Sequence, residues 1–367
     1  MNTKKMRYVW FLVILCIFCL TLFLARTRSK VEMRNRIYHQ WNEHFVVSKG
    51  KESYVRTTND SNQTVVLSEA QSYGMLITVA AAEKGQAQQA DFDRLYHYYL
   101  NHRLEGTQLM SWKQTISNGK AKDEDHNATD GDLYIAYALL KAAQQWPKQA
   151  KDYQAQAKAI LEDILAHNYN EETGVLTVGN WANQDSEFYH LMRTSDTLPA
   201  QFQIFYEVTK DSKWLDIKEK MLQQLQTISS QTKTGLLPDF IWVDEQGTRV
   251  ADPKTIESKY DGAYSYNACR LPYNLVQSKD ATSQKLVKKM LNFFKSQRNL
   301  YAGYDLKGKA LNNHQAASFL APIVYASEHE KGYLKLVQQN KYIFTQDLPL
   351  NNYYDATMTT MIALELF

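Results

Sequence analysis

Cysteine is scarce in this sequence, and patterns that hold metal ions or phosphate groups are missing. Of the three cysteines, Cys16 and Cys19 lie in an apolar N-terminal run and only Cys269 lies beyond it. No disulfide can therefore form within the rest of the chain. No Cys/His cluster has zinc-ligand spacing, and no glycine-rich phosphate loop is present. We expect neither a metal nor a cofactor.

An excess of basic charge is confined to one end of the chain. Residues 1–30 contain no acidic residue, whereas the remainder has 36 basic against 39 acidic residues. A mildly acidic domain lacks the basic surface that nucleic-acid binding needs. We therefore expect no nucleic-acid partner.

The one long uncharged run is Tyr8–Ala25, whose eighteen residues are enough to cross a bilayer. Basic residues precede it, as in a secretory signal, but Phe23-Leu24-Ala25 is too bulky for a small-x-small cleavage site. We interpret residues 1–30 as an uncleaved signal anchor with one membrane-spanning helix at 8–25, and residues 31–367 as one domain.

Beyond this run, two kinds of predicted helix alternate. Charge-poor segments begin near Ser68, Thr129, Asp196, Gly262, Asn313 and Tyr353. Amphipathic segments cover 32–46, 87–103, 149–167, 211–229, 281–298 and 331–343. A helix that is apolar on nearly every side is buried, whereas one with a single apolar stripe is a surface helix. We expect an all-α fold, an (α/α)6 barrel of six inner and six outer helices, because no repeated strand signal competes.

The stretch Ala128–Trp146, ATDGDLYIAYALLKAAQQW, places two carboxylates at the start of a helix that has a single later charge. Thr129 or Asp130 can cap that helix start. The stretch resembles the signature of glycoside hydrolase family 8, and Ser68–Met75, SEAQSYGM, resembles a second block of the family. The resemblance covers about 37–367 and also implies the (α/α)6 fold.

The resemblance implies roles for the acids of these two blocks. It makes Glu69 the general acid, and it assigns Asp130 to holding the distorted sugar ring at the cleavage subsite. Asp132 is expected to hydrogen-bond its own turn, with substrate contact as the alternative. Tyr73 lies in the block of Glu69 and is expected on the substrate side. A helix N-terminus lowers the pKa of a carboxylate, so the negative charge of Asp130 and desolvation must raise that of Glu69.

The catalytic base departs from the better-known family pattern. One branch, including many cellulases, has this carboxylate where the present chain has Asn267. A second branch, resembling chitosanases and lichenases, also has asparagine there and takes a glutamate base from the preceding loop. The stretch Arg193–Asp196 resembles that second branch too. We expect Glu257 as the base and keep Asp261 as the second candidate; the same loop also carries Asp239, Asp244, Glu245 and Asp252.

Acids at the starts of parallel inner helices are expected to converge at one end of the barrel. They are Glu69, Asp130, Asp132, Asp196, Asp261 and Asp355. We assign Asp196 and Asn267 to substrate binding. Arg270 lies three residues after Asn267, hence on the same helical face. It is expected to pair with a carboxylate at this end of the barrel, which we call the mouth, or with a substrate hydroxyl. Flat rings for stacking on sugars come from the loops at that end and from the last inner helix, namely Trp112, Trp181, Tyr189, Trp242 and Tyr354.

Taken with the resemblance, these features predict a membrane-anchored inverting endo-glycosidase that hydrolyses β-1,4 or mixed β-1,3-1,4 glucan outside the cell. Chitosan, or a glucosamine exopolysaccharide, is the alternative substrate. Asn267 also leaves open a catalytically inactive glycan-binding protein, and an exopolysaccharide synthesis machine is an expected partner. Basic residues after the span outnumber those before it, which by the positive-inside rule favours a cytoplasmic domain. We nevertheless expect the domain outside, because a polysaccharide hydrolase meets its polymer there.

Overall fold

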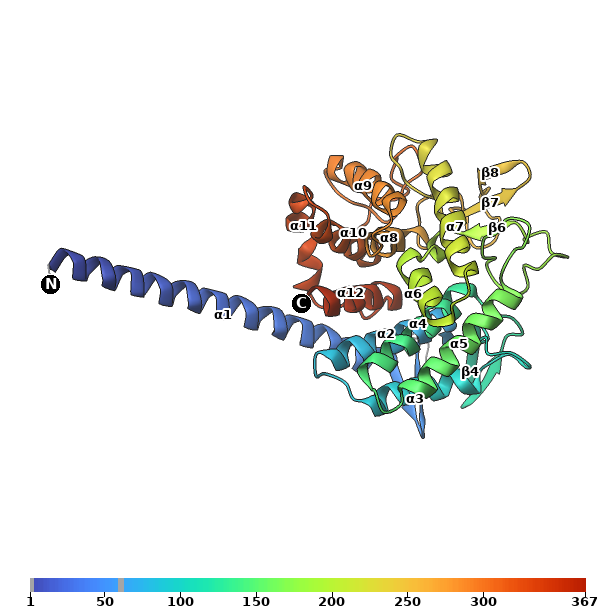
Figure 1. Ribbon diagram of the computed structural model, residues 1–367, viewed down its shortest axis with the longest axis horizontal. Coiled ribbons are helices and arrows are strands. Elements are labelled where there is room, and N and C mark those ends of the chain that lie inside the picture. The colour runs from blue at the N-terminus through green and yellow to red at the C-terminus, as the bar shows by residue number, and fades with distance from the viewer. Residues whose placement is uncertain (1–2, 59–62) are drawn as a thin grey trace.

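Buried helices alternate with surface helices along the chain beyond the N-terminal apolar run (Figure 1). The computed structural model describes residues 3–58 and 63–367. In this part the buried helices are α2 (Ser68–Glu83), α4 (Thr129–Gln145), α6 (Pro199–Thr209), α8 (Leu271–Val276), α10 (Ala317–His329) and α12 (Tyr353–Leu366). The surface helices are the end of α1 (Thr3–Phe45), α3 (Gln89–Asn101), α5 (Ala150–His167), α7 (Lys213–Ser230), α9 (Ala281–Ser296) and α11 (Leu334–Asn340). The predicted alternation is confirmed, and the fold is mostly helical.

Helices α4 and α9 illustrate why the two kinds differ. Between Asp132 and Lys141, α4 carries no charge, and most of its residues are buried. Helix α9 instead buries one stripe, which includes Leu286, Met290 and Phe294, and its start is capped where Asp280 accepts from two backbone N–H groups. Apolar periodicity therefore decided which helices lie inside.

Three buried helices begin later than the sequence pattern predicted. The fourth starts with a 3-10 turn at Ala268–Arg270 rather than near Gly262, because Asp239 Oδ1 accepts from the backbone N–H groups of three residues there. The third follows a 3-10 turn at Thr194–Asp196 and begins at Pro199, whose fixed φ suits a first helical position. The fifth begins at Ala317 instead of near Asn313.

The predicted capping of α4 is wrong. Ala128 occupies the cap position and no side chain caps the helix. The hydroxyl of Thr129 donates to the backbone carbonyl of Thr177, and the Asp130 carboxylate accepts only from the adjacent N–H of Gly131 among backbone groups. The Thr129 side chain therefore contacts another segment, and the backbone contact of Asp130 within the helix does not cap it.

Small antiparallel sheets lie among the loops that lead into the buried helices. In the described residues they comprise β1 (Val46–Lys49) with β2 (Glu52–Val55), β3 (Thr64–Leu67) with β4 (Lys113–Ser117) and β5 (Lys120–Asp123), and β6 (Leu191–Arg193) with β7 (Phe240–Asp244) and β8 (Gly247–Val250). The prediction of an all-α chain missed them because each strand has at most five residues. Strand β3 runs directly into α2, and β6 into the 3-10 turn at Asp196, so the sheets hold the helix starts in place.

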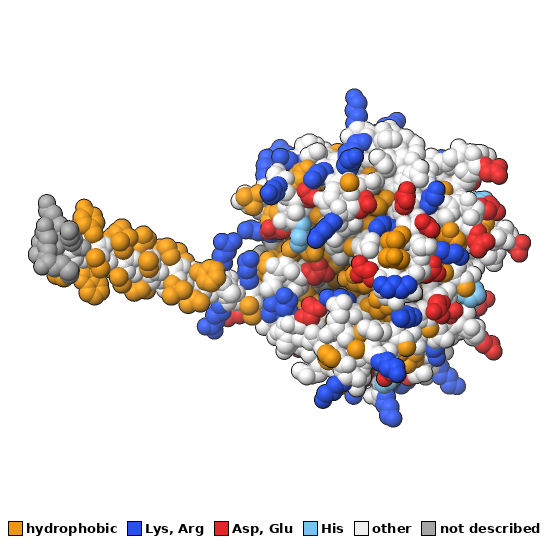
Figure 2. Space-filling model, viewed as in Figure 1, with side chains coloured by type: hydrophobic (Ala, Val, Ile, Leu, Met, Phe, Trp, Pro, Cys, Tyr) orange, Lys and Arg blue, Asp and Glu red, His pale blue; other side chains and the backbone are white. Residues whose placement is uncertain are grey.

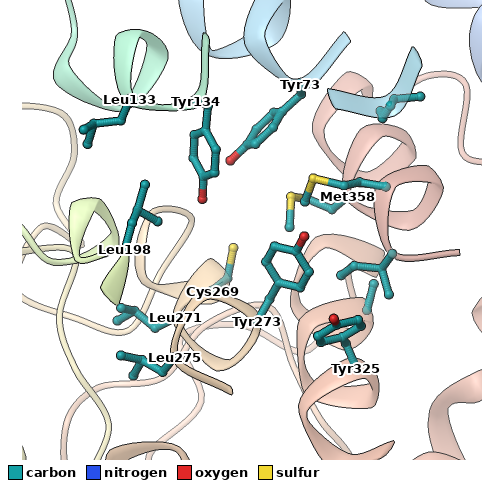
Figure 3. Packing of buried hydrophobic residues seen from close by; sticks show 14 of the residues in the cluster. Tyr73, Leu133, Tyr134, Leu198, Cys269, Leu271, Tyr273, Leu275, Tyr325 and Met358 are labelled. Carbon is teal, nitrogen blue, oxygen red and sulfur yellow. The ribbon is translucent and has the colours of Figure 1, made fainter. Parts of the chain in front are cut away.

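Large side chains from several buried helices meet in one hydrophobic core. Figure 3 shows Tyr73 of α2 and Tyr134 of α4 directed toward the segment that carries Cys269 and Tyr273. The Tyr134 hydroxyl donates to Asn274 Oδ1 at 3.1 Å, which satisfies a polar group inside the core. The core thereby locks the helices that carry the predicted site residues.

Helix α1 is continuous from the apolar run into the helical domain. Its apolar N-terminal part projects from the rest of the molecule (Figures 1 and 2), and it is long and apolar enough to cross a membrane. Its last turns are buried through Ile37, Trp41 and Phe45. The predicted boundary at residue 30 therefore lies inside a single helix, which is compatible with either a signal sequence or an anchor.

Candidate active site

The starts of α2 and α4 approach closely enough to bring two carboxylates to the same arginine. A Cβ at Gly131 would lie 2.2 Å from Ser68 Oγ, so glycine is what permits this approach. Arg270 donates from Nη1 to Glu69 Oε2 at 2.8 Å and to Asp130 Oδ2 at 3.1 Å. The predicted pairing of Arg270 with a mouth carboxylate is confirmed.

The guanidinium of Arg270 donates hydrogen bonds to acceptors from several segments of the chain. Besides the two carboxylates, it donates to the hydroxyl oxygens of Tyr73 at 2.9 Å and Ser195 at 2.8 Å, and to Asn267 Oδ1 at 3.2 Å. Its side chain is 1% exposed. A buried guanidinium with this many acceptors has one orientation, which fixes the carboxylates that it contacts.

A second arginine connects Asp130 to the predicted base. Arg193 Nη1 lies 3.3 Å from Asp130 Oδ1, and its Nη2 donates to Glu257 Oε1 at 3.2 Å. The other oxygen of Glu257 accepts from Asn267 Nδ2 at 2.8 Å. Glu257 therefore lies directly against the amide that stands at the position where the cellulase-like branch has its base.

A cleft of about 380 Å³ opens over these groups. Its walls carry Glu69, Asp130, Arg193, Glu257 and Asn267 together with rings and small residues, namely Leu67, Ser68, Trp112, Ala128, Tyr266, Tyr353 and Tyr354. The backbone N–H of Ser68 donates to the carbonyl of Trp112 at 2.9 Å, which places this ring beside the start of α2. The cleft thus combines carboxylates with flat rings, a combination suited to sugars.

The two carboxylates on Arg270 have opposite pKa shifts. Burial raises the pKa of Glu69 to about 7, which the positive charge of Arg270 opposes and the negative charge of Asp130 reinforces. Burial acts on Asp130 in the same direction, but Arg193 and Arg270 outweigh it and lower its pKa. Adjacent carboxyl groups with pKa values driven apart can serve as a proton donor and an anion at the same pH.

Asp261 lies in the same loop as Glu257 but is absent from the cleft walls. It is fully buried, and its two carboxylate oxygens accept from the backbone N–H groups of Ile256, Glu257 and Ser258 at 2.7–3.0 Å. Asp261 also precedes α8 by ten residues, so the expectation that it lies at an inner-helix start is wrong. Its oxygens are occupied in shaping the loop.

Four further predicted substrate-binding residues lie outside the cleft walls. Asp132 accepts from the backbone N–H of Met110 and from Asn127 Nδ2, both at 2.8 Å, so it braces a turn. Tyr73 lies beneath Arg270, and Asp196 is buried with its Oδ2 3.6 Å from Arg193 Nη1. Tyr189 is buried, and its carbonyl accepts from Asn170. Tyr73 and Asp196 thus contact the two arginines of the site, whereas in the part of the chain that the structure describes no contact links the Tyr189 side chain to the cleft.

Other rings extend from the cleft across the neighbouring loops. Trp112 stacks on His126 with ring centroids 5.8 Å apart, and His126 contacts Trp181 at 6.2 Å. Trp181 in turn packs against Phe188, which stacks on Trp242. Trp181 is therefore connected to the cleft through this row, although it does not line the cleft itself.

Sequence reasoning missed the parts of Arg193 and Tyr266. Arg193 is the sole basic residue other than histidine between residues 180 and 209. Its contacts with Asp130 and Glu257 appear only in the folded structure. Tyr266 is 43% exposed and faces the cleft, with no sequence signal beyond its place beside Asn267. In residues 3–58 and 63–367, no group of three His, Cys, Asp or Glu side chains is placed to hold a metal ion.

Comparison with known proteins decides the family. The family described as glycosyl hydrolases family 8 matches residues 13–365. The chain belongs to glycoside hydrolase family 8. It is therefore a glycoside hydrolase, as the motifs around Glu69 and Asp130 indicated.

Two curated proteins illustrate the relationship to this family 8 enzyme. A beta-glucanase of Niallia circulans is 31% identical over 298 residues, which are 78% of this chain and 72% of that protein. An endoglucanase of a Bacillus species is 30% identical over 275 residues, 71% of this chain and 58% of the relative. The chain thus spans less than two thirds of the second relative.

Solved structures show the same fold. A beta-1,3-1,4-glucanase from Paenibacillus sp. X4 superimposes with a TM-score of 0.83 at 25% identity, covering 93% of this chain and 92% of that chain. Rex8A from Paenibacillus barcinonensis, solved with xylose, gives a TM-score of 0.72 at 22% identity, covering 91% and 93%. At the lower identity the likeness shows the fold alone.

Proposed function

We propose that this family 8 glycoside hydrolase is an inverting endo-glycosidase of β-1,4 or mixed β-1,3-1,4 glucan. The observation that carries the proposal is the pair of glutamates in the cleft. Burial raises the pKa of Glu69 to about 7, and Glu257 is held between Arg193 and Asn267. One group is suited to give a proton and the other to take one.

In the proposed reaction, protonated Glu69 gives its proton to the glycosidic oxygen as the bond to the anomeric carbon breaks. Glu257 takes a proton from a water that attacks the same carbon from the opposite face. The electron pair of the broken bond stays on the leaving sugar, which departs as an alcohol. Asp130, ionised between two arginines, binds the distorted ring of the sugar. A single displacement inverts the configuration, so a β-linkage yields an α-configured reducing end.

We assign the base to Glu257 because its carboxylate lines the cleft, whereas its rivals either are no carboxylate or lie outside the cleft walls. Asn267 is an amide and cannot take a proton from water. The oxygens of Asp261 are occupied by three backbone N–H groups. A catalytically inactive binding protein has no use for a glutamate whose pKa is raised toward neutrality, so we favour the enzyme.

The charge balance of the cleft favours neutral glucan over chitosan. Glu69, Asp130 and Glu257 face two arginines in a connected series of contacts, which leaves little unpaired negative charge for a cationic sugar. The rings of Trp112, Tyr266 and Tyr354 suit stacking on sugars of either kind. The names of the relatives, a beta-glucanase and a beta-1,3-1,4-glucanase, agree with this substrate.

We further propose that the six buried helices close an (α/α)6 barrel and that residues 1–30 anchor this barrel, as one domain of residues 31–367, to the outer face of the cell membrane. The apolar length of α1 supports an anchor. An exopolysaccharide synthesis machine is a fitting partner for such an arrangement, because it would deliver a polymer to the same surface.

The proposal is tested by the anomeric configuration of the first products from barley-type mixed-linkage glucan and from cellulose oligosaccharides. Proton NMR determines this configuration before mutarotation. We expect the α-anomer and mid-chain cleavage. Initial β-anomer would mean a retaining mechanism, and release of sugars only from chain ends would contradict endo action. Parallel assays on chitosan and xylan, with Glu69→Gln as the blank, identify the alternative substrate if glucans are not cleaved.

A further inference from the structure

Helices α1 and α12 lie antiparallel. Three contacts between them show which end of α12 lies near the apolar run and which end lies far from it. At the end nearest the apolar run, Arg34 Nη1 donates to the backbone carbonyl of Phe367 at 2.9 Å. In the middle, Trp41 Nε1 donates to Thr357 Oγ1 at 2.9 Å. At the far end, the rings of Phe45 and Tyr353 are 6.0 Å apart. The start of α12 is therefore the end farther from the apolar run.

The cleft lies at that far end. Tyr353 and Tyr354, the first residues of α12, line its walls. The C-terminus of α12 lies at the opposite face, close to where α1 leaves the domain, whereas strands β6, β7 and β8 lie at the distant end (Figure 1). The catalytic mouth therefore faces away from the N-terminal apolar segment.

The helix between the apolar run and the domain has no break. Residues 3–45 form one helix without proline or glycine, the residues at which sharp bends are usually found. Arg28 and Glu32 form an i,i+4 ion pair at 2.8 Å across the junction. Between them in the chain, the Lys30 ammonium lies 5.5 Å from the centroid of the Phe367 ring. The domain therefore contacts α1 within a few residues of the end of the apolar run.

In the proposed anchored protein, the length of α1 between the apolar run and the cleft sets the height of the cleft above the membrane. Ala25 ends the uncharged run and Phe45 lies level with the cleft, and at 1.5 Å per residue this separation is about 30 Å for an upright helix. A tilt of 20–40° still leaves more than about 20 Å. Neither the cleft nor the residues around it can reach glycan that lies at the bilayer surface.

We propose that α1 acts as a rigid strut that holds the cleft about 30 Å above the membrane and facing outward. The inference rests on the proposed membrane anchorage. It specifies the substrate class: the enzyme cleaves polysaccharide that extends well beyond the bilayer and spares short oligosaccharides attached to lipid. A reaction that elongates the polymer must therefore precede this hydrolysis.

The first test measures the orientation without using activity. In a Cys16→Ser/Cys19→Ser background, which leaves the buried Cys269, donor dyes are placed at Lys259→Cys or Gln346→Cys in full-length protein. Lys259 lies two residues from Glu257, and the Gln346 carbonyl accepts from Arg36 at 3.2 Å, near the lower part of α1. With acceptor lipids in phosphatidylcholine–phosphatidylglycerol vesicles, we expect stronger energy transfer from position 346 than from 259. The reverse order would overturn the proposal.

The second test compares glycans on the same vesicles. One mixed-linkage gluco-oligosaccharide is offered free in solution, and joined to lipid through Gly/Ser spacers of about 4 or about 40 residues, whose mean spans are roughly 11 and 35 Å. Enzyme and glycan share one dilute vesicle population. We expect cleavage of the free and long-spacer forms and a loss of roughly tenfold or more for the short spacer, which cannot span the distance.

The matched control is a flexible Gly-Gly-Ser-Gly-Gly insertion between Ser29 and Lys30. It lets the domain bend toward the bilayer, so cleavage of the short-spacer form should return. Equal cleavage of both lipid forms by the unmodified protein would overturn the proposal, and so would unchanged sparing of the short spacer after the insertion. Failure to cleave even the free glycan would refute the proposed substrate instead, and the energy-transfer result would still decide the orientation.

Discussion

A single nitrogen of Arg270 contacts both Glu69 and Asp130, at 2.8 and 3.1 Å. The two acids come from helices that start about sixty residues apart, so their shared partner couples the proposed proton donor to the group proposed to bind the sugar. Because the arginine is buried, its positive charge acts on both with little screening. The ionisation of one acid therefore influences the other.

Replacing Glu69, the proposed proton donor, should slow the reaction strongly while keeping the substrate bound. Glu69→Gln keeps the shape of the side chain but cannot release a proton to the leaving oxygen. We expect kcat to fall by about 10²–10⁴-fold, with a nearly unchanged Kd for a gluco-oligosaccharide measured by calorimetry. Near-normal turnover would remove Glu69 from this role.

The pH dependence of the rate should follow the proton on Glu69. This group must be protonated to act, and burial raises its pKa to about 7. We therefore expect kcat/KM to decline as the pH rises through about 7, measured with a soluble oligosaccharide. A rate that stays constant up to pH 9 would contradict the assignment.

Activity lost on removal of Glu257, the proposed base, should be partly restored by another anion in the same space. Glu257→Ala should abolish turnover while leaving the fold intact, because this loop side chain is 44% exposed. Adding Asn267→Asp to Glu257→Ala supplies a carboxylate where Asn267 contacted the missing group, and azide offers a small anion in the same space. Partial return of activity by either route, followed by NMR of the products, is the expected result; full activity of Glu257→Ala alone would place the base elsewhere.

Asp261 should act through the loop rather than on water. Asp261→Ala leaves three partly buried N–H groups without their acceptor. An unpaired N–H group costs about 1–3 kcal/mol where water cannot replace its partner. We expect a lower Tm together with reduced activity, and no recovery with azide. Azide rescue of Asp261→Ala, with Glu257→Ala unaffected, would reverse the two roles.

Asp132 should make the fold sensitive to alkaline pH. Burial raises its pKa to about 8, so the folded state holds a proton that the unfolded chain has released. Its contribution to stability is complete at acidic pH and is lost as the pH rises toward and through about 8. Asp132→Asn keeps an acceptor for the Met110 N–H and should flatten the decline of Tm between pH 5 and 9. An equally steep decline in this variant would show that other groups cause it.

The order of the helices, and which of them are buried, could be predicted from the amino-acid sequence, because apolar periodicity depends only on spacing along the chain. It also placed Glu69 and Asp130 at helix starts and Arg270 on the face of Asn267, since those relations are local. The short strands were not predicted, because each has too few residues to show an alternating pattern. Their pairing partners, such as Leu67 and Lys113, are also far apart in the chain.

The partners of each acid, by contrast, follow only from the packing of the folded chain. Asp130 and Asp132 are two residues apart, yet one faces two arginines in the cleft and the other braces Met110 and Asn127. Glu257 and Asp261 share a loop, but backbone N–H groups occupy only Asp261. Partners of this kind come from distant segments, and burial sets the pKa only once those segments have packed. The same packing of α1 against α12 turned the cleft away from the apolar run, a relation that no local pattern contains.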